Sequence, residues 1–309
     1  SFIKHERMKT YFLQVKEVIQ ETADTVTLSF WHPISEQIKY KAGQFITISI
    51  PTSDGKKVKR SYSMSSSPAT DTAVAVTVKR VPKGVVSNYL NDNVHTGDFL
   101  EVIEPMGSFF FEPSENANRN IFLFGAGSGI TPLISIAKTV LKTEPNTKVL
   151  LLYGNRSEES IIFKKELEIL ESQYKDRFSV QYILSQPSST WVGAKGRIHQ
   201  ANTTIWLKDA CVDFKKDNFF MCGPEEMMDE IKRIFELYEV PKSQVHYERF
   251  NAPMQEEDTE KADELKKQTV KVIYDGDTHE FVVEPHQTIL EAALEQDIDL
   301  PYSCQAGMC

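Results

Sequence analysis

The sequence FGAGSGITP has a composition suited to holding a phosphate group. Gly125, Gly127 and Gly129 allow a sharp backbone turn and a close approach of the main chain to a ligand. The residues that follow predict a helix from Thr131, and the amino terminus of a helix attracts a pyrophosphate. The third glycine of the usual dinucleotide fingerprint would fall at Ile130, so an ordinary strand–helix turn remains an alternative.

A second polar cluster, RSYS, comprises Arg60, Ser61, Tyr62 and Ser63. A cation, an aromatic ring and hydroxyls within four residues of a strand could hold a flavin. Arg60 would pair with a phosphate, Tyr62 would stack on the ring, and Ser63 would form a hydrogen bond near its reactive nitrogen. A polar edge strand without any ligand would contain the same residue types.

The strand predicted after the glycine-rich turn ends in YGNRSEES. Proteins that bind NAD often place a carboxylate near the ribose 2′-hydroxyl, whereas proteins that bind NADP place a cation near the 2′-phosphate. Arg156 and Ser157 come before Glu158 and Glu159 in this segment, so we expect NADPH to be preferred. Ser157 also suits a helix cap, and the two acidic residues leave NADH open.

Two of the four cysteines, Cys304 and Cys309, have four residues between them and resemble part of a cluster-binding loop. Thiolates are the usual ligands of iron–sulfur clusters and of zinc. No cysteine or histidine pair elsewhere completes a zinc site by its spacing. Because two thiolates are too few for a [2Fe–2S] cluster, we expect the native protein to continue past Cys309 and to supply two more cysteines.

Short runs of alternating or β-branched residues in the first third of the chain predict a small antiparallel barrel. These runs are FLQVKEVI, TVTLSFW, QFITISI, AVAVTVKR and DFLEVIEP, with a helix expected near VVSNYLNDN. After Asn120 strands alternate with helices, among them SEESIIFKKELEILESQY, which we expect to form one helix. This alternation predicts a parallel sheet with crossover helices.

The remaining sequence predicts a linker and a third, small unit. Residues 251–267 lack aromatic residues and are dense in charge, as linkers are. A hairpin around Asp275–Gly276 and a capping box at Thr288–Glu291 follow. We therefore expect a barrel in residues 1–115, an α/β domain in 116–250, and the amino-terminal part of a small α+β domain in 268–309.

The formal net charge of −9 is concentrated at one end of the chain. Residues 255–309 contain 14 acidic and 4 basic residues and carry a net charge of −10. This segment is either an acidic solvated tail or a module that docks on a basic surface. A nucleic-acid partner is not expected without basic patches. The charged amino terminus and the small cysteine content lead us to expect a cytoplasmic protein without membrane insertion.

Five motifs in a fixed order carry a family resemblance. They are RSYS, VKRVPKGVVSNYL, GAGSGITP, MCGPEEM and HYERF. Over about residues 10–250 the chain resembles the ferredoxin–NADP reductase family, in which a flavin barrel precedes a nicotinamide domain. The tail resembles a plant-type ferredoxin of the β-grasp fold, whose ligand pattern is C-x4-C-x2-C plus a distant cysteine. The combination is similar to reductase components of phenylacetyl-CoA epoxidase and related multicomponent oxygenases.

The resemblance implies roles for individual residues of this sequence. The residues implied for FAD are Arg60, Ser61, Tyr62, Ser63, Val78, Lys79, Gly84, Val85, Val86 and Ser87. Those implied for the nicotinamide nucleotide are Gly127, Thr131, Pro132, Cys222, Gly223 and Pro224, beside Arg156 and Ser157. The implied catalytic residues are Ser63, Cys222 and Phe250, and the implied cluster ligands are Cys304 and Cys309. Cys211 matches no motif, and we expect it to be a core thiol.

The resemblance also implies an NAD(P)H-dependent flavoprotein reductase. NADPH donates a two-electron hydride and an iron–sulfur centre accepts single electrons, so a flavin has to act between them. The implied partner is a terminal oxygenase or another redox protein. Two alternatives stay open: a freestanding flavin or ferric reductase that does not use the third unit, and a third unit that is a ubiquitin-like docking module without a cluster.

Overall fold

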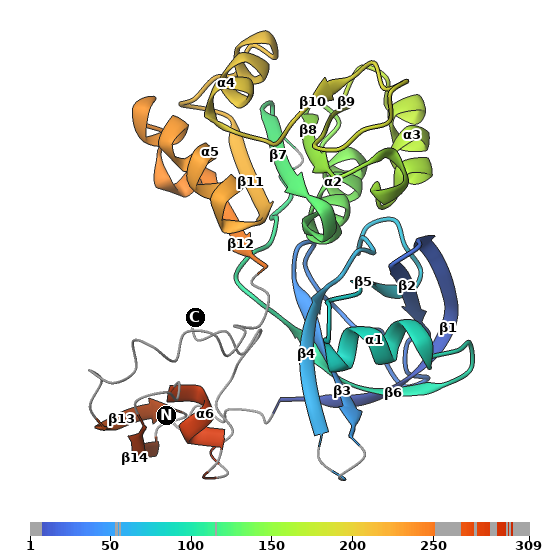
Figure 1. Ribbon diagram of the computed structural model, residues 1–309, viewed down its shortest axis with the longest axis vertical. Coiled ribbons are helices and arrows are strands. Elements are labelled where there is room, and N and C mark those ends of the chain that lie inside the picture. The colour runs from blue at the N-terminus through green and yellow to red at the C-terminus, as the bar shows by residue number, and fades with distance from the viewer. Residues whose placement is uncertain are drawn as a thin grey trace. The chain divides into compact units, whose positions relative to one another are not determined.

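The computed structural model describes residues 8–52, 55, 57–114, 116–250, 267–274, 277–284, 289–294, 296 and 298 (Figure 1). The chain divides into two compact units, of which one is Thr10–Phe250 and the other contains Asn251–Cys309. In the described part of the chain, no helix is both long enough and apolar enough to cross a membrane.

An antiparallel six-stranded sheet in the order β4-β3-β6-β1-β2-β5 forms the barrel. Its strands are β1 (Thr10–Thr22), β2 (Thr25–Phe30), β3 (Phe45–Pro51), β4 (Lys57–Ser63), β5 (Val74–Lys79) and β6 (Phe99–Met106). An isolated bridge from Met64 to Val76 connects the two edges. Side chains alternate between the two faces of each strand, and those of Leu13, Leu28 and Ile46 point into the barrel core. Helix α1 (Val85–Asp92) packs beside β4 and β5.

A parallel six-stranded sheet in the order β10-β9-β8-β7-β11-β12 forms the α/β domain. Its strands are β7 (Asn120–Ala126), β8 (Lys148–Asn155), β9 (Phe178–Leu184), β10 (Ala194–Lys195), β11 (Asn218–Gly223) and β12 (Val245–Arg249). Its helices are α2 (Ile130–Thr143), α3 (Lys164–Gln173), α4 (Gln200–Asp209) and α5 (Glu225–Leu237). Because successive β7 residues face opposite sides, Leu123 packs with α2 and α3, whereas Phe124 packs with α5.

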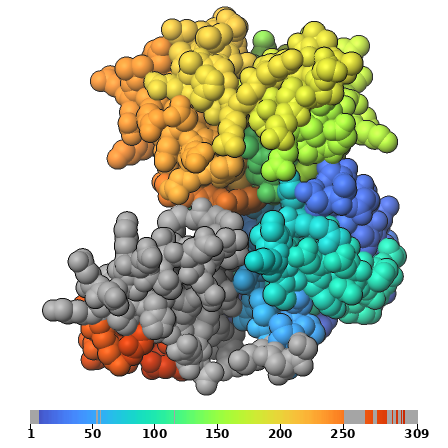
Figure 2. Space-filling view, in the orientation of Figure 1, coloured from blue at the N-terminus to red at the C-terminus, as the bar shows by residue number. Residues whose placement is uncertain are grey.

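The two domains of this unit are in direct contact, as Figure 2 shows for the barrel in blue to cyan and the α/β domain in green to orange. Part of the contact is apolar. Phe109 and Phe111, which follow β6, pack edge-to-face on Phe220 of β11. The predicted antiparallel barrel followed by a parallel α/β sheet is therefore confirmed.

One predicted helix was wrong in its extent. The run SEESIIFKKELEILESQY contains a single 3-10 turn (Glu158–Ser160) and a buried segment before α3 begins at Lys164. Ile161 and Ile162 are buried in the core of the α/β domain. Phe163 adopts a left-handed backbone conformation with φ of 62°, which breaks the helix there.

The second unit contains the predicted hairpin and helix. Strands β13 (Gln268–Tyr274) and β14 (Asp277–Val283) pair antiparallel, and α6 spans Ile289–Leu294. Phe281 and Val283 of β14 pack on Ala292 and Ala293 of α6. The predicted linker at 251–267, apart from Lys267, and the turn residues Asp275–Gly276 lie outside the described residues.

Candidate functional site

A cavity of about 980 Å³ lies between the barrel and the α/β domain of the first unit. The α/β domain contributes residues that follow the carboxyl ends of its strands, including the turn Gly127–Gly129 after β7 and Gly223 at the end of β11. The barrel contributes Asp24, Lys79 and Arg80. The strand order reverses between β7 and β11, and open α/β sheets bind ligands at such a switch point.

The glycine-rich turn is shaped by contacts that only glycines permit. Gly127 has a φ of +52°. A Cβ added to Gly129 would lie 2.1 Å from the carbonyl oxygen of Cys222, so the turn contacts the end of β11 through its backbone. The Thr131 hydroxyl donates a hydrogen bond to the Ser128 carbonyl, 3.0 Å away, and is therefore occupied in the turn itself.

The start of α2 fits a pyrophosphate. Thr131 and Pro132 lie in the first helical turn with buried side chains, and among the described residues no side chain caps this helix. The Ile130 N–H is already bonded to the carbonyls of Gly127 and Ser128, so this helix start attracts an anion mainly through its positive end. Proline costs no hydrogen bond in this first turn.

Arg156 follows β8 and lines the cavity together with Asn155. Its side chain is exposed, and its guanidinium makes no ion pair with any residue described. Ser157 and Ser160 form a capping box around the 3-10 turn. The Glu158 carboxylate accepts hydrogen bonds from the backbone and hydroxyl of Ser188, which lowers its pKa and holds it outside the cavity lining.

The four residues of the RSYS motif occupy β4 but do not line this cavity. Arg60 and Tyr62 pair with Ile48 and Ile46 of β3 and therefore share one strand face. Tyr62 packs against the barrel core, and burial raises its pKa. Ser61 lies on the opposite face, where its hydroxyl bonds to Thr47 over 2.8 Å.

Ser63 ends β4 and, like Tyr62, retains a hydroxyl that forms no hydrogen bond with the described residues. Strand alternation places it on the same face as Ser61. It is 5% exposed, and its hydroxyl has no hydrogen-bond partner within the described ranges. The hydroxyl therefore keeps donor and acceptor capacity for a ligand atom.

The residues predicted for the flavin phosphates surround the start of α1. Gly84 is the N-cap residue, and no described side chain caps the helix. A Cβ on Gly84 would lie 2.7 Å from the Ser87 hydroxyl, which itself accepts a hydrogen bond from the Val81 N–H at 3.1 Å. Ser87 therefore shapes the turn, while the uncapped start of α1 fits a phosphate.

The other predicted contacts near α1 differ in accessibility. Val78 of β5 is fully buried in the barrel core, so only its backbone could meet a ligand. Lys79 lines the cavity, with its ammonium 3.7 Å from a carboxylate oxygen of Asp24. Val85 is exposed at the helix start, and Val86 is buried.

Phe250 lines the cavity, whereas Cys222 does not. Cys222, one residue before the end of β11, is fully buried, and burial, followed by the charge of Glu248, raises the pKa of its thiol. The thiol is therefore neutral and not a nucleophile at pH 7. Gly223, Pro224 and Phe250 all line the cavity.

Sequence reasoning missed Glu248, which pairs with Cys222 in the register of β12 against β11. Burial raises the pKa of Glu248 to about 7. Its carboxyl makes no ion pair or hydrogen bond with the residues described. Its position two residues before Phe250 in HYERF was the available signal. Arg197 and His199, which line the cavity between β10 and α4, were also missed.

The cysteine predictions had different outcomes. Cys211 was expected in the core, but it is exposed in a left-handed turn with φ of 55° after α4, so that prediction was wrong. Cys304 and Cys309 lie outside the described residues. Within the described ranges, no group of three or more histidines, cysteines or carboxylates could hold a metal ion.

Three families match successive parts of the chain. Residues 12–111 match the oxidoreductase FAD-binding domain, residues 123–233 the oxidoreductase NAD-binding domain, and residues 272–309 the 2Fe-2S iron-sulfur cluster binding domain. The FAD/NAD-binding domain of nitric oxide dioxygenase from Vibrio cholerae O1 biovar El Tor has a TM-score of 0.68 at 26% identity, covering 80% of this chain and 100% of that one.

Two curated relatives are similar over nearly the whole chain. The ferredoxin reductase component of 3-ketosteroid-9-alpha-monooxygenase from Rhodococcus rhodochrous is 37% identical, covering 97% of this chain and 84% of the relative. A component of 1,2-phenylacetyl-CoA epoxidase from Escherichia coli K12 is 34% identical, covering 96% and 84%. The predicted cofactors FAD, NAD(P)H and a [2Fe–2S] cluster agree with the three matched domains. The chain belongs to the family of NAD(P)H-dependent ferredoxin reductases that combine an FAD-binding domain, an NAD-binding domain and a 2Fe-2S domain.

Proposed function

We propose that this reductase oxidises NADPH in the cavity between its barrel and α/β domain and serves a terminal oxygenase through its 2Fe-2S domain. The cavity carries the proposal, because the glycine turn, Lys79 of the barrel and Phe250 all line it. The two curated relatives named above are components of a monooxygenase and of an epoxidase, which supports an oxygenase as the class of acceptor.

A bound flavin supplies the exchange between a two-electron donor and one-electron acceptors. The barrel's residues bind and orient it in this proposal. Arg60 holds a phosphate, Tyr62 stacks on the ring, and the unbonded Ser63 hydroxyl meets the reactive edge. The uncapped start of α1 at Gly84–Ser87, with Lys79 and the Val78 backbone nearby, holds the remaining phosphate charge.

The α/β domain orients the nucleotide. The turn at Gly127 and the start of α2 at Thr131 and Pro132 hold the pyrophosphate. Arg156, with Ser157 behind it, meets the 2′-phosphate, because Arg156 lines the cavity while Glu158 is bonded to Ser188. This arrangement favours NADPH over NADH.

The nicotinamide end is assigned to the residues after β11 and β12. Gly223 and Pro224 line the nicotinamide end of the cavity. The Cys222 thiol is neutral and contributes to the packing of this end, not to its charge. Phe250 supplies the aromatic wall next to the flavin. Glu248 lies beside Cys222 in the sheet and is able to hold or release a proton near pH 7.

Cys304 and Cys309 are proposed as ligands of the [2Fe–2S] cluster, because they lie in the matched 2Fe-2S domain with the spacing of a plant-type loop. The test compares anaerobically purified wild-type protein with Cys304→Ser, Cys309→Ser and the control Cys211→Ser. We measure iron and sulfide, flavin content, and NADPH-driven reduction of ferricyanide and of cytochrome c.

Both cluster variants should lose iron, keep their flavin and ferricyanide activity, and reduce cytochrome c at least about tenfold more slowly, while Cys211→Ser resembles the wild type. Unchanged cytochrome c reduction in the iron-free variants would instead favour a freestanding flavin reductase. Absence of iron from the wild type would favour a docking module.

A further inference from the structure

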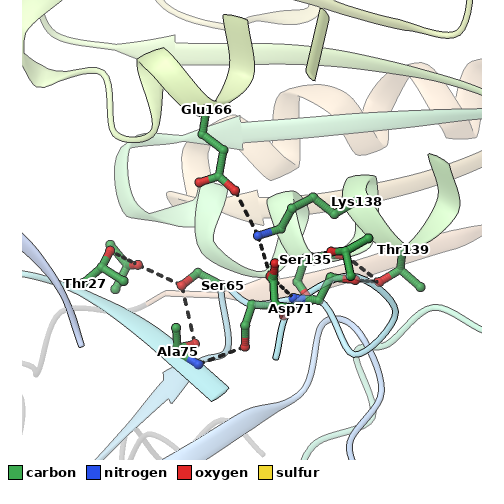
Figure 3. A network of polar contacts seen from close by, with 12 residues as sticks. Thr27, Ser65, Asp71, Ala75, Ser135, Lys138, Thr139 and Glu166 are labelled. Atoms are coloured by element: carbon green, nitrogen blue, oxygen red, sulfur yellow. Dashed lines mark hydrogen bonds and ion pairs between the residues drawn. The ribbon is translucent and has the colours of Figure 1, made fainter. Parts of the chain in front are cut away.

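One part of the contact between the barrel and the α/β domain is polar and buried (Figure 3). The Ser135 hydroxyl of α2 donates a hydrogen bond to the Ser66 carbonyl over 2.6 Å. The hydroxyls of Ser67 and Thr139 are 2.7 Å apart. All four residues are buried, so these bonds are shielded from competing water.

Lys138 connects the same two domains by charge. Its ammonium lies 2.8 Å from a carboxylate oxygen of Asp71 and 3.0 Å from one of Glu166, and its side chain is 11% exposed. Asp71 belongs to the barrel loop after β4, whereas Glu166 belongs to α3 of Lys138's own domain. Ser135, Lys138 and Thr139 are spaced by three and four residues, which places them on one side of α2.

The electrostatic surroundings keep Lys138 charged. Burial acts to lower its pKa, but the carboxylates of Glu166 and Asp71 outweigh burial and raise it. Glu21 of β1 also contributes to this field, and burial raises the pKa of that carboxyl. Removing the lysine would therefore leave carboxylates of both domains facing each other without a cation.

The contact between α2 and the loop Ser65–Asp71 lies between the strand proposed for the flavin and the turn proposed for the nucleotide. Asp71 follows the flavin strand β4 by eight residues, and Ser67 follows it by four. Lys138 lies about two turns into α2, which begins directly after the turn Gly127–Gly129 that lines the nucleotide cavity. A shift of α2 against the loop Ser65–Asp71 would therefore move the nucleotide turn relative to β4.

We propose that Lys138 is a positioning residue, whose ion pair with Asp71 fixes α2 against the barrel loop and thereby sets the nicotinamide in line with the flavin for hydride transfer. This inference rests on the proposed function. Hydride transfer depends steeply on the donor–acceptor geometry, so a small loss of alignment slows the chemical step more than it weakens binding.

The test compares Lys138→Met and Asp71→Asn with three controls. Glu166→Gln removes the ion pair that stays within one domain. Lys142→Met changes an exposed lysine one turn later on α2. Lys138→Arg keeps a cation that can pair with both Asp71 and Glu166. Stopped-flow reduction of the bound flavin gives the hydride-transfer rate and the Kd of NADPH. Hydrogen exchange measured by mass spectrometry follows the amides of 65–71 and 135–139.

Lys138→Met and Asp71→Asn should slow hydride transfer about tenfold, with the Kd within about twofold of wild type. The three controls should stay within about threefold. Amide exchange in both segments should rise in the two test variants alone. A melting temperature or flavin content that falls while the rate per bound flavin stays at the wild-type value would show a purely structural role and overturn the inference.

Two further results separate the inference from the proposed function. If NADPH does not reduce the flavin of the wild-type protein, the proposed function fails, while the exchange measurement still tests the fixed contact. If the wild type is reduced and Lys138→Met and Asp71→Asn match it in rate and exchange, the inference alone fails. A Glu166→Gln variant as slow as Asp71→Asn would also overturn the cross-domain assignment.

Discussion

The Cys222 carbonyl oxygen lies so close to Gly129 that a Cβ added there would approach it to 2.1 Å. The nucleotide turn after β7 and the end of β11 are therefore in backbone contact. The obstructing atom belongs to a central strand and cannot rotate away. A single methyl group at this position would have to push the turn or the strand out of place.

Gly129→Ala should therefore slow NADPH-dependent flavin reduction by about a hundredfold or more, because the start of α2 can no longer lie against β11. Flavin content should change little, since Gly129 does not belong to the barrel strands or the helix proposed to hold the flavin. The matched control is Gly154→Ala, whose Cβ would meet side-chain atoms alone, those of Ile198 at 3.3 Å and 3.5 Å and of Ala126 at 3.7 Å. Equal reduction rates in the two variants would contradict the expectation.

Arg60→Ala should yield largely colourless protein. Hydrogen bonds to charged groups contribute roughly 1.5–3 kcal/mol each, so losing the guanidinium should weaken flavin binding by about tenfold to a hundredfold. The ratio of flavin to protein after gel filtration measures this. Lys59→Ala is the control, because that side chain lies on the opposite face of β4. A fully flavinated Arg60→Ala protein would remove Arg60 from the phosphate site.

Arg156→Ala should reduce kcat/KM for NADPH by about tenfold or more and leave kcat/KM for NADH nearly unchanged, equivalent to about 1.4 kcal/mol of selectivity. The comparison is Arg197→Ala, since Arg197 also lines the cavity but is paired with Glu226 at 3.5 Å. If Arg197→Ala removes the preference instead, the 2′-phosphate site belongs beyond β10. A wild-type protein that uses both nucleotides equally would end the NADPH assignment.

Glu248 should make the protein less stable as pH rises. Burial raises its pKa from 4.5 to about 7, so between these values the folded protein keeps a proton that the unfolded chain has lost. The free energy of unfolding therefore falls through this window, by up to about 3 kcal/mol. Thermal melting at pH 5.5 and pH 8 should show a larger fall for the wild type than for Glu248→Gln.

The exposed Glu226→Gln variant is the control for that experiment, because the side chain of Glu226 is 87% exposed. It should follow the pH dependence of the wild type. Parallel profiles for the wild type and Glu248→Gln would mean that the Glu248 carboxyl is ionised at low pH and that its burial has little effect.

Local patterns predicted the strands of the barrel and the alternation of strands and helices in the α/β domain. Apolar residues recur every second residue in strands and at helical spacing in helices, and short stretches of sequence are enough to show either period. The two-residue strand β10 at Ala194–Lys195 is too short to give such a pattern. The run from Ser157 to Tyr174 has helical spacing, yet Ile161 and Ile162 are buried in the domain core ahead of α3. Tertiary burial overrode local preference there.

The motifs identified the candidate site only in part. Gly127, Arg156 and Phe250 line the cavity, whereas their contacts with cofactors stay predictions. Glu248 and Lys138 were missed, because each depends on a neighbour distant in the sequence: Cys222 for Glu248 and Asp71 for Lys138. Cys211 was misjudged because a lone cysteine carries no pattern that reveals its exposure.

The uninterrupted run from Arg60 to Asp71 has an evolutionary consequence. It contains both the strand proposed for the flavin and the loop that contacts α2. One residue inserted between Ser63 and Ser67 would lengthen the connection, so that β4 and Asp71 could no longer both keep their present contacts. Among homologous chains that keep this ion pair, alignment gaps should therefore be absent from this run and should collect in loops that contact neither α2 nor the cavity.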